Sequence, residues 1–496
     1  MFQTAFKFFF VIGLSCSVLL GFGRVSFAVN STANQTQKSA PEKLGDISFT
    51  PEGYTSADNI DSFEPGTLEV REAGGNNSTL QKPVAGKTAD KPLTLLEACK
   101  LAVEKHPLVA SSRYSRLEKV ADYGIAKSVY YPRIDFQGQA GPSHNLDTHT
   151  TSYGESSVAL THTLYNFGGL RDSVASARLK AEGAKYRLAR TNEDIAALAI
   201  NSYLTVLQAQ EMLSVYNSAL EFYQKLLDTF WERYNAGISS KADAQKVEVS
   251  LRSTQSQLTV QNQQLSTSKL LLENIIKQPV HAVAKDLNVL QMEIEETLED
   301  AYEIALKNNV SLRAFQSEIE SQEKAVATKT ADYYPSLGYQ VKAKSEFQEV
   351  DGYENSLDAQ LTVNWNLFGG FATEEGVKKE EAVLKRLIAT KQATELEVQN
   401  VLSDAFNAYK SSEEEFKLAK EAYDSSVYLM SLYLSEFDLG IRTLLDLITA
   451  REGQTSASVR EVSARFARIR AGLNIYLEEG RLAEVLGLSL DKDPFE

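Results

Sequence analysis

Two aspartates lie in a repeated pattern that suits either a helix start or an ion site. The pairs are Ser240 with Asp243 and Thr443 with Asp446. Gly237 and Gly440 each precede a pair by three residues. A glycine that ends one helix, followed by a capping box that begins the next, explains the pattern structurally. The functional alternative is that two helical hairpins end at one tip, where carboxylates from several chains form a negatively charged constriction that binds cations and controls passage.

The other residue types that could carry chemistry predict no enzyme. The five histidines are His106, His144, His149, His162 and His281. They form no zinc-binding helix motif, and the spacing His144-x-x-Asp147-x-His149 lies in a predicted surface loop. The sequence contains neither a phosphate-binding loop nor a nucleophile elbow. We therefore predict no catalytic residue, no metal site and no cofactor.

The acidic balance of the chain excludes one class of partner. The 496 residues include 51 Lys and Arg against 66 Asp and Glu, which gives a net charge of −15. Removal of residues 1–28, which contain Lys7, Arg24 and no acidic residue, brings the charge to −17. A surface of this sign repels nucleic acid and anionic lipid. We predict no nucleic-acid partner.

The N-terminal segment predicts export. Lys7 precedes an apolar run over residues 8–20, and Ser26-Phe27-Ala28 supplies the small residues that a signal peptidase reads. We predict a cleavable signal peptide over residues 1–28; an N-terminal membrane anchor is the alternative, although the run is shorter than the roughly 20 residues that a span needs. Residues 29–92 are rich in Ser, Thr, Asn, Gly and Pro and predict a flexible leader. Only Cys99 then remains, so no intramolecular disulfide can form.

The chain repeats itself over a long distance. Glu97-Ala98 reappears as Asp300-Ala301 at an offset of 203. The same offset relates two Tyr-Tyr-Pro motifs, each at the end of a predicted helix, and the two glycine breaks. A Phe-Gly-Gly motif recurs at an offset of 201, which implies a difference in loop length. Chance similarity does not keep such an order. We predict a first repeat over 93–277, a connection over 278–297, a second repeat over 298–490 and a tail over 491–496.

Four short segments alternate between apolar and polar residues, which predicts strands. One face carries Ile134 and Phe136, then Val158, Leu160 and Leu164. The second repeat has the same alternation around Val341 and again around Leu361, where it continues through Trp365. Each segment has about 9 to 12 residues, close to the 9 to 11 that a tilted strand needs to cross a bilayer. A soluble sheet with one face on a core is the alternative.

Aromatic residues gather where these strands meet the helices. They are Tyr130, Tyr131, Tyr165, Phe167, Tyr333, Tyr334, Trp365 and Phe368. All the strand ends concerned lie on the same side, so we predict one aromatic girdle at a membrane interface. Four strands cannot close a membrane barrel, because the smallest have about eight, and an open edge in lipid is forbidden. The barrel must then be shared, with two copies giving eight strands and three giving twelve.

The remaining segments predict helices too long for a globule. From Ile195 apolar residues, with some small or polar ones such as Ser202, recur at alternating steps of four and three, and adding 203 to each position preserves this heptad seam from Val398 onward. No proline lies between Ser143 and Gln278 or between Ser336 and Asp493. A helix of about 65 residues spans on the order of 100 Å.

With these motifs in this order, residues 93–490 resemble the TolC-like family of outer-membrane efflux and secretion channels. The resemblance implies a homotrimer with a twelve-stranded barrel continued by a helical tunnel. It also implies a periplasmic adaptor and an inner-membrane transporter as partners. By position Asp446 is similar to the pore-ring carboxylate of the family, and Asp243 and Arg442 to residues that hold the tip closed. Phe437 and Thr449 depart from the pattern, which implies a single carboxylate ring and a weaker closure.

The fold class that follows is an α+β membrane protein built from a duplicated helix-strand-strand-helix unit. The predicted function is a passive exit duct of a tripartite efflux or type I secretion system, in contact with outer-membrane lipid and extending into the periplasm of a Gram-negative bacterium. The alternative is a periplasmic coiled-coil protein with a structural or adaptor role, which needs no lipid-facing strands.

Overall fold

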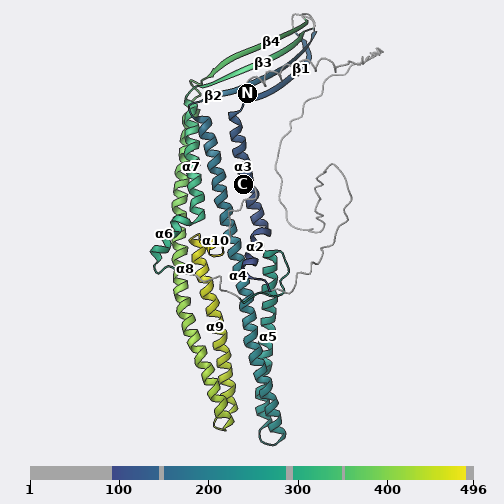
Figure 1. Cartoon of the computed structure of the whole chain (residues 1–496), viewed down its shortest axis with the longest axis vertical. Helices are drawn as coiled ribbons and strands as arrows, with labels where there is room; N and C mark the ends of the chain where they lie inside the picture. The colour runs from purple at the N-terminus through teal and green to yellow at the C-terminus, as the bar shows by residue number, and fades with distance from the viewer. Residues whose placement is uncertain (1–91, 145–149, 286–293, 349–351, 488–496) are drawn as a thin grey trace, which may run out of the picture. The chain divides into compact units, whose positions relative to one another are not determined.

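The computed structural model describes residues 92–144, 150–285, 294–348 and 352–487 (Figure 1). The predicted signal peptide, the predicted tail and all of the predicted leader except Pro92 lie outside these residues, as do Asp147 and His149. The described residues belong to the second of two units into which the chain divides, which begins at Ala85.

The described part is helical with one antiparallel sheet, and the same series of elements occurs twice. The first series is α2 (Leu95–Lys105), α3 (Pro107–Lys127), β1 (Arg133–His144), β2 (Thr150–Tyr165), α4 (Gly169–Asn235) and α5 (Lys241–Ile276). The second series is α6 (Leu298–Asn308), α7 (Val310–Thr330), β3 (Ser336–Gln348), β4 (Gly352–Asn364), α8 (Ala372–Asp438), α9 (Leu444–Glu478) and the short α10 (Leu482–Val485). This confirms the predicted duplication and fold class.

The segment before each Tyr-Tyr-Pro motif was predicted as one helix, and the structure shows two. His106 caps α3 by accepting a hydrogen bond from the Leu108 N–H at 3.3 Å, and Pro107 has no N–H to continue the preceding helix. In the second repeat Asn309 caps α7, and its Oδ1 accepts from the Ser311 N–H at 3.0 Å. The break is therefore capped in both copies, although only one has a proline.

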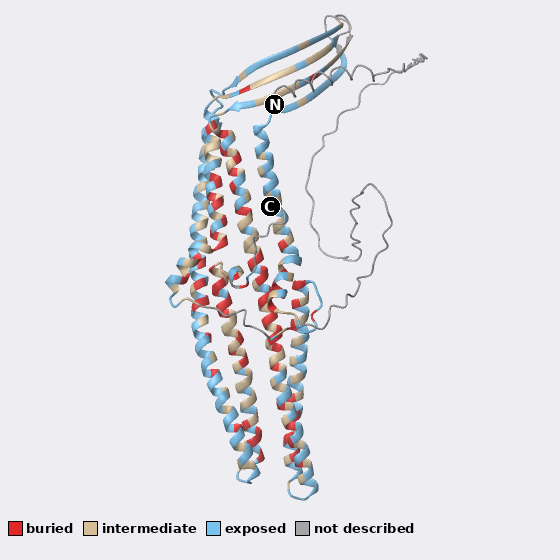
Figure 2. Cartoon of the chain, in the orientation of Figure 1, coloured by how far each residue is buried: buried red, intermediate tan, exposed pale blue. Residues whose placement is uncertain are grey.

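The long helices α4 and α8 have 67 residues each, in agreement with the prediction, and span about 100 Å at 1.5 Å per residue. Every predicted seam position is buried or half-buried, and the buried residues follow the lines where helices face one another (Figure 2). In α4, Ile200, Tyr203 and Leu204 are fully buried in a cluster that includes residues of α2, α5 and α9. No helix in the described ranges is both long and apolar enough to cross a membrane.

The sheet has the order β1-β2-β3-β4, and every neighbouring pair is antiparallel. Residues paired in register share a face. Two rows of the apolar face are Ile134–Leu160–Val341–Ala359 and Phe136–Val158–Ala343–Leu357. The predicted apolar positions of four strands therefore align on one side. On this side Phe136 is 73% exposed and Leu361 is 74% exposed.

Two details of the strand prediction are wrong. The register shifts between Thr163 and Tyr165, so Tyr165, and not Leu164, pairs with Leu337 in the apolar row. Trp365 lies beyond the end of β4, because the last pair of the ladder joins Ser336 to Asn364. The residue before Ser336 is Pro335, which has no N–H to extend the ladder.

The opposite face of the sheet is polar and internally bonded. Lys342 lies 3.7 Å from Glu155, and Lys344 lies 3.9 Å from the same carboxylate. Gln360 donates to Gln340 across the β3–β4 pair at 2.9 Å. The sheet thus has one apolar and one polar face, as the alternation predicted.

Candidate functional site

The turn between α4 and α5 forms the first hairpin tip. Gly237 adopts the left-handed conformation with φ 73°, and its N–H donates to the carbonyl oxygen of Tyr234 at 2.9 Å. Ser240 begins α5, since its Oγ accepts from the Asp243 N–H at 3.2 Å and donates to the Asp243 carboxylate at 2.8 Å. Glycine ends one helix here and the serine starts the next.

The turn between α8 and α9 forms the second hairpin tip with the same backbone. Gly440 has φ 75°, and its N–H donates to the carbonyl oxygen of Phe437 at 3.0 Å. Thr443 and Asp446 form a reciprocal capping box: the Thr443 N–H donates to the carboxylate at 3.0 Å, and the Asp446 N–H donates to Oγ1 at 3.3 Å. The pair closes the first turn of α9.

The charged partners at the two tips differ. Lys246 Nζ lies 3.3 Å from Asp243 Oδ1 at the first tip. At the second tip Arg442 Nε lies 2.6 Å from Glu436 Oε2, and the guanidinium lies 4.3 Å from the centre of the Tyr433 ring. Within one chain, therefore, Asp243 and Arg442 each have a charged partner in their own hairpin.

Hydrogen bonds keep both tip aspartates ionised. The Ser240 hydroxyl lowers the pKa of the Asp243 carboxyl below its ordinary value, with a further contribution from Lys246. The Thr443 N–H lowers the pKa of the Asp446 carboxyl, helped by the Thr443 hydroxyl and by Arg442. Each tip therefore carries a fixed negative charge at neutral pH.

An aromatic contact joins the two tips within the chain. The Phe437 ring lies 6.1 Å from the Phe230 ring of α4, and the Arg233 guanidinium lies 5.3 Å from the Phe437 ring. Leu226, Val247 and Leu447 belong to the same buried cluster, to which Phe437 is packed. Phe437 thus belongs to the packing that holds the two hairpins of one chain together.

The predicted girdle residues lie at the helix-proximal edge of the sheet, where β1 and β3 begin and β2 and β4 end. The Phe167 ring lies 5.0 Å from the Tyr165 ring and stacks on the Tyr334 ring at 4.8 Å. Trp365 Nε1 donates to the Tyr333 carbonyl oxygen at 3.1 Å. Tyr131 and Phe368 are exposed at the same edge. The structure therefore gathers these aromatic residues at one level of the sheet.

Neither tip is built as a metal site. In the part of the chain that the structure describes, no group of three or more His, Cys, Asp or Glu is placed to hold a metal ion. Asp243 and Asp446 each use one oxygen on their own cap. A single chain can offer each of these carboxylates to a passing cation only as an isolated charge.

A family model described as outer membrane efflux protein matches residues 98–276 and matches again over residues 301–479. The chain belongs to the outer membrane efflux protein family. Each boundary of the second match lies 203 residues after that of the first, which is the offset of the sequence repeat. The efflux protein is thus located in the outer membrane of a Gram-negative bacterium, and its helices extend into the periplasm.

Relatives and solved structures agree with this assignment. The chain is 20% identical over 406 residues to the outer membrane efflux protein BepC of Brucella suis, covering 80% of this chain and 88% of BepC. It is 20% identical over 418 residues to the alkaline protease secretion protein AprF of Pseudomonas aeruginosa, covering 79% and 85%. The crystal structure of CusC has a TM-score of 0.68 at 14% identity, covering 78% of this chain and 92% of that chain.

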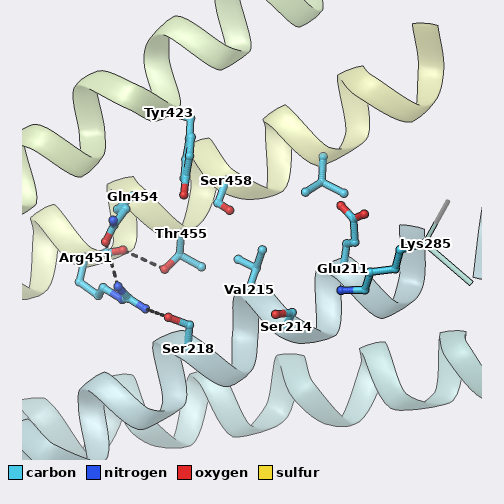
Figure 3. Close-up of a pocket in the computed structure, with 11 residues that line it drawn as sticks. Glu211, Ser214, Val215, Ser218, Lys285, Tyr423, Arg451, Gln454, Thr455 and Ser458 are labelled. Atoms are coloured by element: carbon cyan, nitrogen blue, oxygen red, sulfur yellow. Dashed lines mark hydrogen bonds between the residues drawn. The ribbon is translucent and has the colours of Figure 1, made fainter. Parts of the chain in front are cut away.

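The efflux protein also has a polar groove that sequence reasoning missed. It has a volume of about 350 Å³ between α4, α8 and α9 (Figure 3). Arg451 of α9 donates across it to Ser218 Oγ of α4 at 3.0 Å and to Gln454 at 2.9 Å. Hydroxyl residues at helical spacing, such as Ser214 with Ser218, were the available signal. The groove separates the hairpin of the first repeat from that of the second.

Other partners at the tips also went unpredicted. Lys246 is three residues after Asp243 on α5, a spacing that can be read from the sequence. Glu436 is six residues before Arg442, and only the reversal of the chain at Gly440 brings the two together. The first partner was predictable from helical periodicity, whereas the second required the turn.

Proposed function

We propose that this efflux protein is a homotrimeric exit duct that conducts substrate passively across the periplasm and the outer membrane. The observation that carries the proposal is the sheet, whose apolar residues align in register on one exposed face while the other face is polar. Such a sheet fits between lipid on one side and water on the other.

The edges of the sheet support a shared barrel. In the described part of one chain, β1 and β4 each pair along one side only. An unpaired strand edge is not tolerated in lipid, because its N–H and C=O groups have no partner there. If β1 of each copy pairs with β4 of the next, three copies close twelve strands and leave no edge. In the proposal, formation of the trimer therefore closes the barrel that crosses the membrane.

The aromatic edge supports an orientation of this barrel. Tyrosine and tryptophan are enriched where a membrane protein passes from lipid to water. In the proposal the girdle lies at the periplasmic interface with outer-membrane lipid. Its residues are Tyr131, Tyr165, Phe167, Tyr334, Trp365 and Phe368.

The exposed apolar residues of the helices support a tunnel wall made by several copies. Val249 and Leu270 of α5 are 70% and 57% exposed, and Leu418 and Tyr428 of α8 are 56% and 67% exposed. These apolar side chains would be removed from water if another chain covered the helices. We assign α5 and α8 to contacts between copies, with the two hairpins of each copy forming part of one tunnel.

The partners in the proposal are those that the resemblance to the family implies. The sequence has no phosphate-binding loop, and in the proposal the energy comes from an inner-membrane transporter that is reached through a periplasmic adaptor. The matched relatives are named for efflux in one case and for protease secretion in another. Crosslinking in cells, followed by identification of the attached adaptor and transporter, separates a drug pump from a protein-secretion system.

The tips are the proposed periplasmic gate. Gly237 and Gly440 form the turns, and three copies of Asp446 form a carboxylate ring. Asp243 and Arg442 hold neighbouring helices together in the closed state. Because Phe437 and Thr449 depart from the family pattern, the gate has a single carboxylate ring and a weaker closure. Asp446→Asn should weaken block of the channel by divalent cations, because the ring loses its charge. Asp243→Asn should instead raise the resting conductance, because it loosens the closure, while divalent cations still block the open channel, because the Asp446 ring keeps its charge. Unchanged block in Asp446→Asn refutes the ring.

The shared barrel is tested by crosslinking between copies. Cys99 is buried and is the only cysteine left after the predicted signal cleavage. A disulfide between copies must therefore come from the introduced cysteines. Gln137→Cys in β1 is combined in turn with cysteines at residues 355, 356, 357 and 358 of β4. We expect one or two of these pairs to give a crosslinked trimer. A soluble monomer that forms no crosslink in any pair would support the periplasmic structural or adaptor role instead.

A further inference from the structure

The junction between α4 and the end of α9 holds three carboxylates around one guanidinium. Arg190 Nε of α4 lies 2.9 Å from Asp194 Oδ1, and Arg190 Nη2 lies 3.3 Å from Glu478 Oε1 of α9. Glu193 of α4 is the third carboxylate. We call Arg190, Glu193, Asp194 and Glu478 the junction cluster. It joins the first repeat to the second, because α4 and α9 belong to different repeats.

Glu193 is the least satisfied member of the junction cluster. It is 2% exposed, and its Oε2 atom has no hydrogen-bond partner. The neighbouring Asn192 is 6% exposed, and its Oδ1 atom also has no hydrogen-bond partner. Two adjacent residues of α4 therefore each bury an acceptor atom that receives no hydrogen bond. An ionised carboxylate is costly to bury without donors, whereas a neutral carboxyl group is much less so. The geometry therefore favours a proton on Glu193.

The charges around Glu193 do not supply the missing cation. Arg190 makes its contacts with Asp194 and Glu478, and both of those carboxylates repel a charge on Glu193. Helix α3 packs at this level through a 3.2 Å bond between Ser112 and Thr191, and carries Arg113 and Arg116 beside that contact. Helix α7 brings Glu318 to α4, where it pairs with Arg187, six residues before Glu193.

A second group of charges follows at the end of α9. Arg481 Nη1 lies 2.7 Å from Glu295 and 3.3 Å from Glu479, which is 1% exposed. The Asn309 amide donates to the Glu478 carbonyl oxygen at 2.9 Å and ties the α6–α7 break to this point. A change of charge at Glu193 would thus act where several elements of both repeats meet.

We propose that Glu193 is a proton-binding switch that controls how tightly α4 and α9 join the two repeats. When neutral, the side chain packs in the junction without an unmet charge. When ionised, it repels Glu478 and Asp194 and loosens the junction. This role goes beyond conduction and makes the protonation state of one side chain a regulator of the packing between the hairpins.

The direction of the pH dependence follows from burial. Burial raises the pKa of the Glu193 carboxyl from 4.5 to about 7, against the opposing effect of Arg190. The folded chain then binds the proton more tightly than the unfolded chain, so stability is full below about pH 4.5 and falls as pH rises through about 7. The full difference in pKa corresponds to a change of at most about 300-fold in the folding equilibrium.

Infrared spectroscopy of the purified full-length protein tests the switch directly. The C=O stretch of protonated buried carboxyl groups should disappear as the pH rises from about 5 to about 9. Glu479 must contribute to the same band, because burial also raises its pKa to about 7. Glu193→Gln should remove one part of the band, and the matched control Glu479→Gln should remove the other. An unchanged band in Glu193→Gln overturns the proposal.

Two further measurements test the switch, and the first of them, with Glu478→Gln, keeps the test decisive if Glu193→Gln does not fold. Glu478→Gln removes one repelling carboxylate and releases Arg190 toward Glu193, so the Glu193 part of the band should shift to lower pH. In thermal unfolding, the wild-type midpoint should fall between about pH 5 and about pH 8, and Glu193→Gln should flatten that fall. A titration that does not move in Glu478→Gln, or an equally steep fall in Glu193→Gln, contradicts the switch.

Discussion

The two hairpin tips share a backbone but differ in the side chains around it. Gly237 and Gly440 have φ values of 73° and 75°, and an aspartate bonded to the capping hydroxyl follows each. The equivalent positions nevertheless carry different residues. The pairs, first tip against second, are Arg233 and Glu436, Ser239 and Arg442, Ala244 and Leu447, and Lys246 and Thr449.

The two tips share the residues that form the turn and differ in the charged residues around it. Both copies share the glycine and the cap: the glycine adopts the left-handed backbone that ends one helix, and the capping hydroxyl accepts from an N–H in the first turn of the next. The charges have diverged: Asp243 has Lys246 one turn along its helix, whereas Asp446 has Thr449 at the equivalent position. The second tip therefore presents its carboxylate with less neutralisation from its own helix, which agrees with the ring role that the resemblance to the family implies for Asp446.

Leu447→Ala should produce the largest effect on stability. The substitution gives the second tip the alanine that the first tip has at the equivalent position, Ala244. Leu447 is 1% exposed in the cluster that joins the tips, so its truncation removes buried contacts and leaves a cavity. We expect a loss of about 2–5 kcal/mol in unfolding free energy, measured by denaturant titration. Leu445→Ala, at a position 60% exposed on the same helix turn, should cost far less. Equal losses would mean that the two tips do not pack as described.

Gly440→Ala and Gly237→Ala should produce smaller effects of equal size. At both positions an added Cβ would meet no atom within 4 Å, so the cost is the left-handed backbone alone. We expect each variant to lose about 1–2 kcal/mol in the same unfolding experiment. Gly453→Ala, within α9 and equally open, should instead gain about 0.5–1 kcal/mol. A loss at only one tip would show that the shared backbone is not what stabilises both turns.

The smallest expected effect is a loss of stability in acid that depends on both tip aspartates. The folded pKa of each lies below the ordinary value of 3.8, so the stabilisation is complete above about pH 3.8 and is lost as pH falls toward the folded value. Thermal unfolding at about pH 5 and about pH 3 should therefore differ less in Asp243→Asn and Asp446→Asn than in the wild type. An undiminished difference in both variants would place the acid sensitivity elsewhere.

Local patterns predicted the parts of the fold that depend on local physics. The helix length, the seam, the glycine turns and the strand alternation follow from periodicity and from residues such as Gly440. The duplication added a check, since each pattern had to recur at the same offset. The aromatic edge was predictable for the same reason, because an antiparallel order fixes which strand ends meet.

Features that depend on packing between distant segments were not predictable. Glu193 is one of several glutamates on α4, and the sequence alone does not show which of them other helices bury. The Arg442–Glu436 pair needs the turn, and the groove beside Arg451 needs two repeats side by side. The register shift between Thr163 and Tyr165 breaks the alternation locally, so the period-2 pattern assigned Leu164 instead of Tyr165 to the apolar row.

Single-channel recording in planar bilayers tests the central claim most directly. The purified full-length protein should insert and give discrete conductance steps of uniform size, because each trimer closes one barrel and one tunnel. The same sample should run as a single trimeric species. Protein that remains monomeric and gives no conductance step would contradict the exit duct.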